Sequence, residues 1–311
     1  MDIFGGIFGF FGSLFGYVLW ASFLLTQNFG VAIIIFTIIV KLVMFPTSIN
    51  QQKSMAGNQR LQAKQNEIRE KYGTDRTKYN EEIQKLYEKE GINPMGGCLT
   101  SFLPMILMLG IFYSVGYPLT NTLHLNALSI NKIVANINAI PGFSGISSSI
   151  YSQIEIVKIF PSISSSSIVT DVLSPLEIEK ILNFSHGFNF LGIDLLSTPK
   201  DFGISALLLI PVLCFLTSFA SQLALTKMSG NPMQQQQGCM KYMFYGLPLI
   251  SSYFSYTVPA AVGLYWIVST VIGFIQSLII NKYYSAALMN AKSEARHVAM
   301  LFSEEASVKE L

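Results

Sequence analysis

Charged residues are scarce in this chain of 311 residues. Asp, Glu, Lys and Arg together make up 12% of it, whereas hydrophobic residues make up 51%. A soluble globular domain carries roughly a quarter of its residues as these four charged types. The shortage therefore excludes an ordinary soluble protein and indicates a polytopic membrane protein. The net charge of +2 says little about partners, because the position of Lys and Arg relative to the membrane spans matters more.

The chain also lacks the features of catalytic and metal sites. Its three cysteines have no paired spacing that would bind zinc or build a disulfide framework, and its three histidines are dispersed. It has no glycine-rich phosphate-binding loop. We therefore expect no enzyme activity, no metal, no cofactor and no sequence-specific nucleic-acid binding. A small-molecule transporter is the alternative, although transporters of this size usually have two similar halves and no such repeat is visible.

What the chain does have is long apolar runs. About 20 helical residues cross the hydrocarbon core of a bilayer. The five predicted spans are residues 29–49, 97–119, 202–225, 242–256 with a few flanking residues, and 260–281. The fourth is the least apolar, and Pro248 and Pro259 would leave backbone carbonyls without partners in lipid. We therefore expect this segment to pack against neighbouring helices.

Residues 3–26 form an ambiguous apolar segment. They lack the basic start of a secretory signal, so cleavage is not expected. Phe4, Phe8, Phe11 and Leu14 recur at helical spacing with Gly and Ser between them, which favours a helix lying in the membrane interface. A sixth span is the alternative, and it would have to turn at "TQNFG" directly into the next span.

The distribution of basic residues predicts the orientation. Residues 51–91 contain nine Lys or Arg and seven acidic residues, so the positive-inside rule places this loop in the cytoplasm. The segment 120–201 has four lysines in some eighty residues and belongs outside. Its serine-rich stretches "SGISSSI" and "SSSSI" suggest loose order. Five spans then put the N-terminus outside and the tail, residues 285–311, in the cytoplasm.

The cytoplasmic segment 51–91 is predicted to be a helical hairpin. Apolar and aromatic residues share a face in each half, and "YGTD" separates the halves, with Gly73 suited to end the first helix and Asp75 to cap the second. The segment is longer than a connector needs to be, which favours an arm that captures or docks partners. The residues predicted to make these contacts are Arg60, Lys64, Arg69, Tyr72, Lys78, Ile83 and Tyr87.

Several motifs follow one another between about residues 28 and 284. They are "NFGVAIIIFTIIVKLVMFP", "QQKSM", "INPMGGCL", "NFLGIDLL" and "VGLYWIVSTVIGFIQ". In this order they resemble the YidC/Oxa/Alb insertase family. The resemblance implies a membrane-embedded insertase that works without nucleotide hydrolysis, built as a five-span helical bundle (residues 29–284) behind an N-terminal interfacial helix (residues 1–28). The large soluble extracytoplasmic domain of some bacterial members is not expected here.

Lys41 is the one charged residue in the apolar run of residues 33–46. It lies about 18 Å along the predicted helix from Phe29, which leaves roughly 7 Å to Pro46. Its ammonium could reach the cytoplasmic interface by snorkelling. The resemblance implies another role, because relatives carry arginine here inside a groove that is open to the cytoplasm and to lipid. Lysine keeps the charge of arginine but loses its planar fork of donors.

Other polar residues are predicted to line the same groove. Gln222, Ser218 and Ser221 lie in the third predicted span, and Trp266 and Ser269 lie in the fifth. Close helix packing is the alternative for the serines. The resemblance further implies a bacterial plasma-membrane protein whose partners are nascent membrane proteins, the ribosome that makes them, a Sec translocon and membrane lipids.

Overall fold

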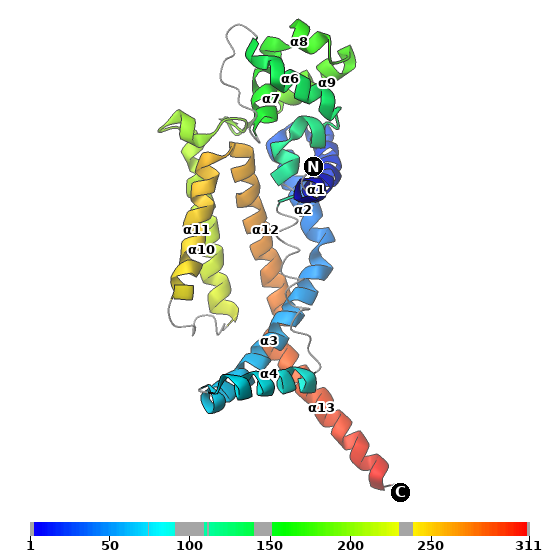
Figure 1. The fold of residues 1–311 in the computed structure, drawn as a ribbon, viewed down its shortest axis with the longest axis vertical. Helices are drawn as coiled ribbons and strands as arrows, with labels where there is room; N and C mark the ends of the chain where they lie inside the picture. Colours follow the sequence, from blue (N-terminus) through cyan, green and yellow to red (C-terminus); the bar gives the residue numbers. More distant parts are fainter. Residues whose placement is uncertain are drawn as a thin grey trace. The chain divides into compact units, whose positions relative to one another are not determined.

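The protein is mostly helical, as the computed structural model shows (Figure 1). The structure describes residues 3–73, 75–90, 109–110, 112–139, 151–229 and 239–309. This result confirms the predicted helical class. The chain divides into two compact units, which are described separately. The first comprises Met1–Lys41, Met105–Gln222 and Gly238–Ile272, and the second comprises Leu42–Pro104, Leu223–Gln237 and Gly273–Leu311.

The first unit holds most of the secondary structure. Its helices are α1 (Ile3–Thr26), α2 (Phe29–Val43), α6 (Ala127–Asn136), α7 (Ser152–Ile163), α8 (Ser167–Thr170), α9 (Pro175–His186), α10 (Leu209–Ser229), α11 (Cys239–Thr257) and α12 (Ala260–Tyr284), and the final residues of α2, α10 and α12 belong to the second unit. Its short elements are η1 (Pro118–Thr122), η2 (Ile137–Ala139), β1 (Asn189–Phe190), β2 (Ile193–Asp194), η3 (Pro199–Phe202) and η4 (Ala206–Leu208). The antiparallel strands β1 and β2 pair Asn189 with Asp194.

Three helical segments among the described residues are long and apolar enough to cross a membrane. They are Gly9–Thr26, Ala206–Met228 and Ala260–Met289. The predicted first span qualifies as a fourth when Phe29–Val43 and Phe45–Lys53 are taken together. The predicted span 242–256 lies within the 19-residue helix α11 but is not among these segments. Most of the predicted span 97–119 lies outside the described residues, so the count of five stays a prediction.

Pro46 explains why the first predicted span is broken. The helix α2 ends at Val43, and α3 (Phe45–Tyr72) starts with Pro46 in its first turn. Proline has no N–H for a helical hydrogen bond, and its ring clashes with the carbonyl four residues earlier. A continuous helix from Phe29 to Ile49 is therefore not formed. The break follows Lys41 within one helical turn.

The helices α10, α11 and α12 make close local contacts in the first unit. The Ser252 hydroxyl of α11 donates a 2.8 Å hydrogen bond to the Pro211 carbonyl of α10. A Cβ atom added at Gly263 of α12 would collide with the side chains of Ile210 and Ser255, which belong to α10 and α11. Small residues allow such close approach between membrane helices. The expected packing of the proline-containing segment against a neighbouring helix is therefore confirmed.

We expect Gly263→Ala to destabilise this bundle. The added methyl group has no room between Ile210 and Ser255, and overpacking typically costs about 1–3 kcal/mol. Gly246→Ala is the matched control, because a Cβ at Gly246 of α11 would meet no atom within 4 Å. Thermal unfolding of the purified protein in detergent should therefore shift downward for Gly263→Ala alone. Equal midpoints for the two variants would contradict the close contact.

The helix α1 docks through its glycines onto the segment before α6. A Cβ at Gly16 would overlap the Asn121 carbonyl of η1, and a Cβ at Gly12 would lie 2.8 Å from Cβ of Tyr113. The other end of α1 joins an aromatic core, where the ring centroids of Phe23 and Phe184 are 5.1 Å apart. This packing accounts for the glycines at positions 12 and 16. The choice between an interfacial and a spanning helix stays a prediction.

The serine-rich stretch 164–168 is folded, and the expectation of loose order was wrong there. The helix α7 ends at Ile163, and the Ser166 side chain accepts a hydrogen bond from the Ile168 backbone at the start of α8. Buried apolar residues hold both helices in place, since Ile163 is 1% exposed and Val169 is fully buried. Serine composition suggested disorder, but these serines cap short helices. The other stretch, residues 144–150, lies outside the described residues.

The helix α9 shows how firmly this region is ordered. Ser174 and Glu177 form a capping box at its start, in which the Ser174 hydroxyl donates to the Glu177 carboxylate. These hydrogen bonds from Ser174 lower the pKa of the Glu177 carboxyl group.

Residues 187–197 then connect α9 to two other helices. The Phe29 backbone N–H donates to the Gly187 carbonyl, and the Ala261 N–H donates to the Leu195 carbonyl, so this connection ties the start of α2 to the start of α12.

The second unit contains α3, α4 (Arg76–Glu90) and α13 (Ala286–Lys309). The first two are separated where the sequence predicts, and Asp75 caps α4 by accepting hydrogen bonds from the backbone of Thr77 and Lys78. Gly73 directly follows the last residue of α3, as predicted, and its φ of −62° is not left-handed. The Gln65 side chain donates a 2.9 Å hydrogen bond to the Tyr87 hydroxyl and thereby joins α3 to α4. The tail helix α13 packs on α3.

Candidate substrate groove

Lys41 lies in the last turn of α2. Earlier residues of this helix are fully packed, since Phe29, Ile33 and Phe36 are at most 1% exposed, whereas Leu42 beyond the lysine is exposed. The Lys41 side chain is half-buried. Within the part of the chain that the structure describes, no carboxylate lies within ion-pair distance of its ammonium. The lysine therefore lies at the edge of a packed core, and none of the described carboxylates pairs with it.

Three predicted groove residues share one face of α10. Ser218, Ser221 and Gln222 are three and four residues apart, which places them on the same side of a helix. All three are half-buried. The Ser218 hydroxyl also interacts with the Cys214 thiol one turn earlier. Ser218 therefore makes a local contact within its own helix, while the face as a whole remains partly accessible.

The other two predicted residues lie on α12 and are also half-buried. The Trp266 ring meets Phe254 of α11 edge to face, with 6.3 Å between centroids. Ser269 interacts with the Tyr265 hydroxyl one turn earlier. All six predicted groove residues thus belong to the first unit and come from three of its helices, α2, α10 and α12.

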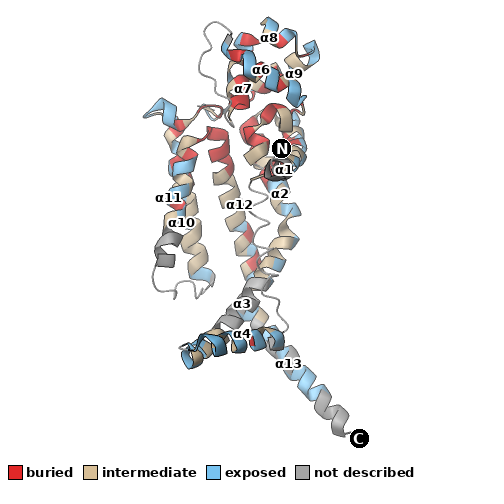
Figure 2. Ribbon diagram, viewed as in Figure 1, coloured by how far each residue is buried: buried red, intermediate tan, exposed pale blue. Residues whose placement is uncertain are grey.

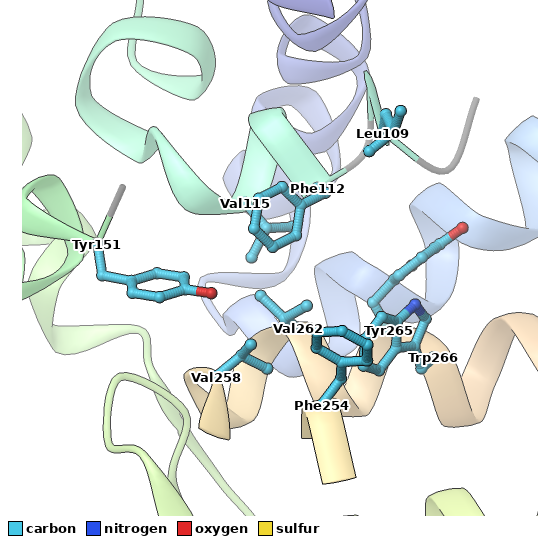
Figure 3. Close-up of a pocket in the computed structure, with 9 residues that line it drawn as sticks. All are labelled: Leu109, Phe112, Val115, Tyr151, Phe254, Val258, Val262, Tyr265 and Trp266. Atoms are coloured by element: carbon cyan, nitrogen blue, oxygen red, sulfur yellow. The ribbon is translucent and has the colours of Figure 1, made fainter. Parts of the chain in front are cut away.

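Trp266 helps to enclose an apolar cavity of about 310 Å³ (Figure 3). The described residues that line it are Leu109, Phe112, Val115, Tyr151, Phe254, Val258, Val262, Tyr265 and Trp266. In Figure 3, Phe112 lies across the cavity from Val258 and Val262, and the Tyr151 ring points between them. Cavities of this size hold small ligands or several side chains, and apolar walls favour apolar groups. The other five predicted groove residues are not part of this lining.

Sequence reasoning did not find the remaining walls of the cavity. Tyr265 and Trp266 of α12 lie three and four residues after Val262, so their common helical face could have been recognised. Tyr151 and the residues between 109 and 115 come from distant parts of the sequence. No local pattern connects them to α12, because their proximity arises from the packing of the helices.

The comparison with known protein families decides the classification. A family model described as "60Kd inner membrane protein" matches residues 20–287. The chain belongs to this family. It is the family of the YidC/Oxa/Alb insertases, so the resemblance inferred from the motifs is confirmed.

Curated relatives match shorter parts of the chain. The chain is 41% identical over 102 residues to the membrane protein insertase YidC of Nitratidesulfovibrio vulgaris, a match that covers 33% of this chain and 18% of that protein. It is 44% identical over 98 residues to the same-named protein of Oleidesulfovibrio alaskensis, covering 32% and 18%. For Geobacter metallireducens the identity is 42% over 89 residues, covering 29% and 16%. The matched region is thus less than a fifth of each relative's length.

The predicted contact residues of this YidC/Oxa/Alb family member in α3 and α4 lie in the second unit. Arg69 and Lys78 are exposed, whereas Lys64, Tyr72, Ile83 and Tyr87 are half-buried. Arg60 lies on α3, but its side chain is outside the described residues. Tyr87 is used within the pair, since its hydroxyl accepts from Gln65. The exposed basic residues therefore remain the best candidates for contacts with a partner.

Proposed function

We propose that this chain is a membrane protein insertase, which helps newly made proteins to enter and fold in the bilayer without hydrolysing a nucleotide. The observation that carries the proposal is Lys41. It is a half-buried lysine at the end of an apolar helix, it has no acidic partner in the described part of the chain, and the family's curated relatives are named membrane protein insertases. A buried cation without a partner usually marks a functional site in a membrane protein.

The energetics of insertion explain the use of such a cation. A charged residue at the centre of a membrane helix costs about 2.5–3.5 kcal/mol on the insertion scale. A hydrated groove bounded by α2, α10 and α12 shortens the dry path that a translocated segment has to cross. Lys41 in that groove attracts Asp or Glu of the arriving segment, because the apolar surroundings screen the attraction less than bulk water does.

The apolar cavity at Trp266 complements this polar path. Its walls are aromatic and aliphatic, so it accepts apolar side chains of a client helix while that helix moves into lipid. The α3–α4 pair captures the client beforehand on the cytoplasmic side. In this proposal the ribosome and a Sec translocon deliver clients, and the groove opens to the cytoplasm and to lipid.

Reconstitution tests the function. Vesicles that contain the purified chain should insert a small single-span client, whereas empty vesicles should not. Photo-crosslinkers at Gln222 and Trp266 should capture a stalled client, and crosslinkers at the exposed positions Leu216 of α10 and Val271 of α12 serve as matched controls. Capture at the control positions alone would reject the groove. Equal insertion into empty and loaded vesicles would reject the insertase function, and the transporter hypothesis would then be favoured.

The proposed topology has five spans, with the N-terminus outside and the C-terminus in the cytoplasm. Ser165 and Asn80 are both exposed, so a cysteine at either position can be reached by a reagent in the adjoining compartment. In a variant without the native cysteines, a membrane-impermeant thiol reagent added to intact cells should label Ser165→Cys. It should label Asn80→Cys only after the cells are opened. The reverse pattern would contradict this orientation.

A further inference from the structure

The turn at residues 199–205, just before α10, exposes two large apolar side chains. Phe202 is 51% exposed and Ile204 is 101% exposed. Gly203 between them has φ +57°, a conformation that glycine adopts without strain. Figure 2 shows the segment before α10 projecting from the end of that helix with an exposed tip. Exposing such large apolar side chains to water costs free energy, so the question is what covers them in the membrane-bound protein.

The turn is held in place from both sides. The Ala260 backbone N–H at the start of α12 donates a 2.9 Å hydrogen bond to the Ser197 carbonyl. The Lys158 ammonium of α7 donates to the Ser197 hydroxyl and lies 5.1 Å from the centre of the Phe202 ring. Pro199 is buried, and η3 contacts α11. The exposure of Phe202 and Ile204 is therefore built into the turn.

The exposed apolar surface continues directly from the turn into α10. The candidate span Ala206–Met228 begins two residues after Ile204. The side chains of Leu209, Val212 and Leu216 are between 51% and 54% exposed, and an exposed apolar face on a spanning helix is the face that meets lipid. The turn thus lies at the level where α10 enters the bilayer.

We propose that the turn 199–205 is a membrane-interface anchor, in which Phe202 and Ile204 insert into the lipid at the boundary between headgroups and acyl chains. Lys158 and Lys200 are exposed beside these side chains, where their ammonium groups can contact lipid phosphates. Asp201 carries the opposite charge in the same turn, so apolar insertion is the main contribution and charge attraction is secondary. The anchor sets the depth at which α10 crosses the membrane.

Spin-label accessibility tests the anchor. A nitroxide is attached to Ile204→Cys in the full chain without its native cysteines, reconstituted in phospholipid vesicles. Oxygen concentrates in lipid and a nickel chelate stays in water, so the label at position 204 should be several-fold more accessible to oxygen than to nickel. Leu176→Cys is the matched control, because Leu176 is a leucine of α9 that is 76% exposed. Its label should favour nickel.

A second variant separates anchoring from mere proximity to lipid. Phe202→Ser combined with Ile204→Asn changes exposed side chains, so the fold should survive, and a label at Leu209→Cys should then become more accessible to nickel. Equal nickel accessibility at positions 204 and 176 would overturn the proposal. Protection of position 204 from both reagents would also overturn it, because a protein partner or a second copy would then cover the turn. An unchanged depth at Leu209 in the double variant would refute the anchoring role.

Discussion

Lys41→Met should slow the insertion of clients with an acidic translocated segment by about tenfold or more. Methionine is similar in length but neutral, so the bundle stays packed while the attraction is lost. Two unit charges about 8 Å apart attract by about 2 kcal/mol at an effective dielectric constant of about 20, and each 1.4 kcal/mol corresponds to about a tenfold change in rate. The measurement is the rate of insertion into vesicles for two clients that differ in their Asp and Glu residues alone.

Lys41→Arg is the matched control for this experiment. Arginine restores the cation, and relatives of this chain are expected to carry it at this position, so insertion of both clients should be retained. A client without acidic residues should be affected little by Lys41→Met. Equal losses for both clients would mean that the lysine serves folding or hydration of the groove. An unaffected rate for both would favour a lysine that snorkels to the interface.

Excision of residues 58–90, replaced by a short flexible linker, should leave a membrane-integrated protein with at least a severalfold loss of insertion. This change removes α4 and most of α3, and with them the Gln65–Tyr87 hydrogen bond that joins the pair. A capture arm concentrates clients near the groove, so its removal lowers the rate at limiting client concentration more than at saturation. Insertion rates at two client concentrations, normalised to protein abundance, measure the effect.

Lys85→Gln is the control that keeps both helices. Lys85 forms an exposed 2.7 Å ion pair with Glu82 on α4, and this pairing raises the pKa of the Lys85 ammonium. Exposed pairs of this kind contribute little to stability. The variant should therefore insert clients at the wild-type rate. If the excised protein also matches the wild type, the α3–α4 pair is a connector and the capture role is refuted.

Composition and periodicity were sufficient for the class and for several local features. The apolar runs predicted membrane-spanning helices, and the YidC/Oxa/Alb resemblance in the ordered motifs was confirmed by the family match over residues 20–287. Asp75 was recognised as a helix cap from its position after "YGT", because capping depends on the nearest few residues. Pro46 could likewise have predicted the break between α2 and α3. Such features depend on neighbours in the sequence.

Other features arise when distant segments meet. The serines at 164–168 suggested disorder, but contacts with buried residues such as Val169 order the helices that they cap. The cavity at Trp266 combines α11 and α12 with Tyr151, Leu109, Phe112 and Val115, and no short pattern links these segments.

The sequence by itself determined that this is a helical membrane protein of the insertase family, with a lysine in its first long apolar run. Hydropathy is sufficient for the helical membrane class, and the ordered motifs carry the resemblance to the family. The tertiary structure decided that this lysine is half-buried, how closely α10, α11 and α12 approach at Gly263, and that Phe202 and Ile204 remain exposed. Burial, close approach and exposure depend on how the helices pack, and that packing is made by contacts between residues far apart in the sequence.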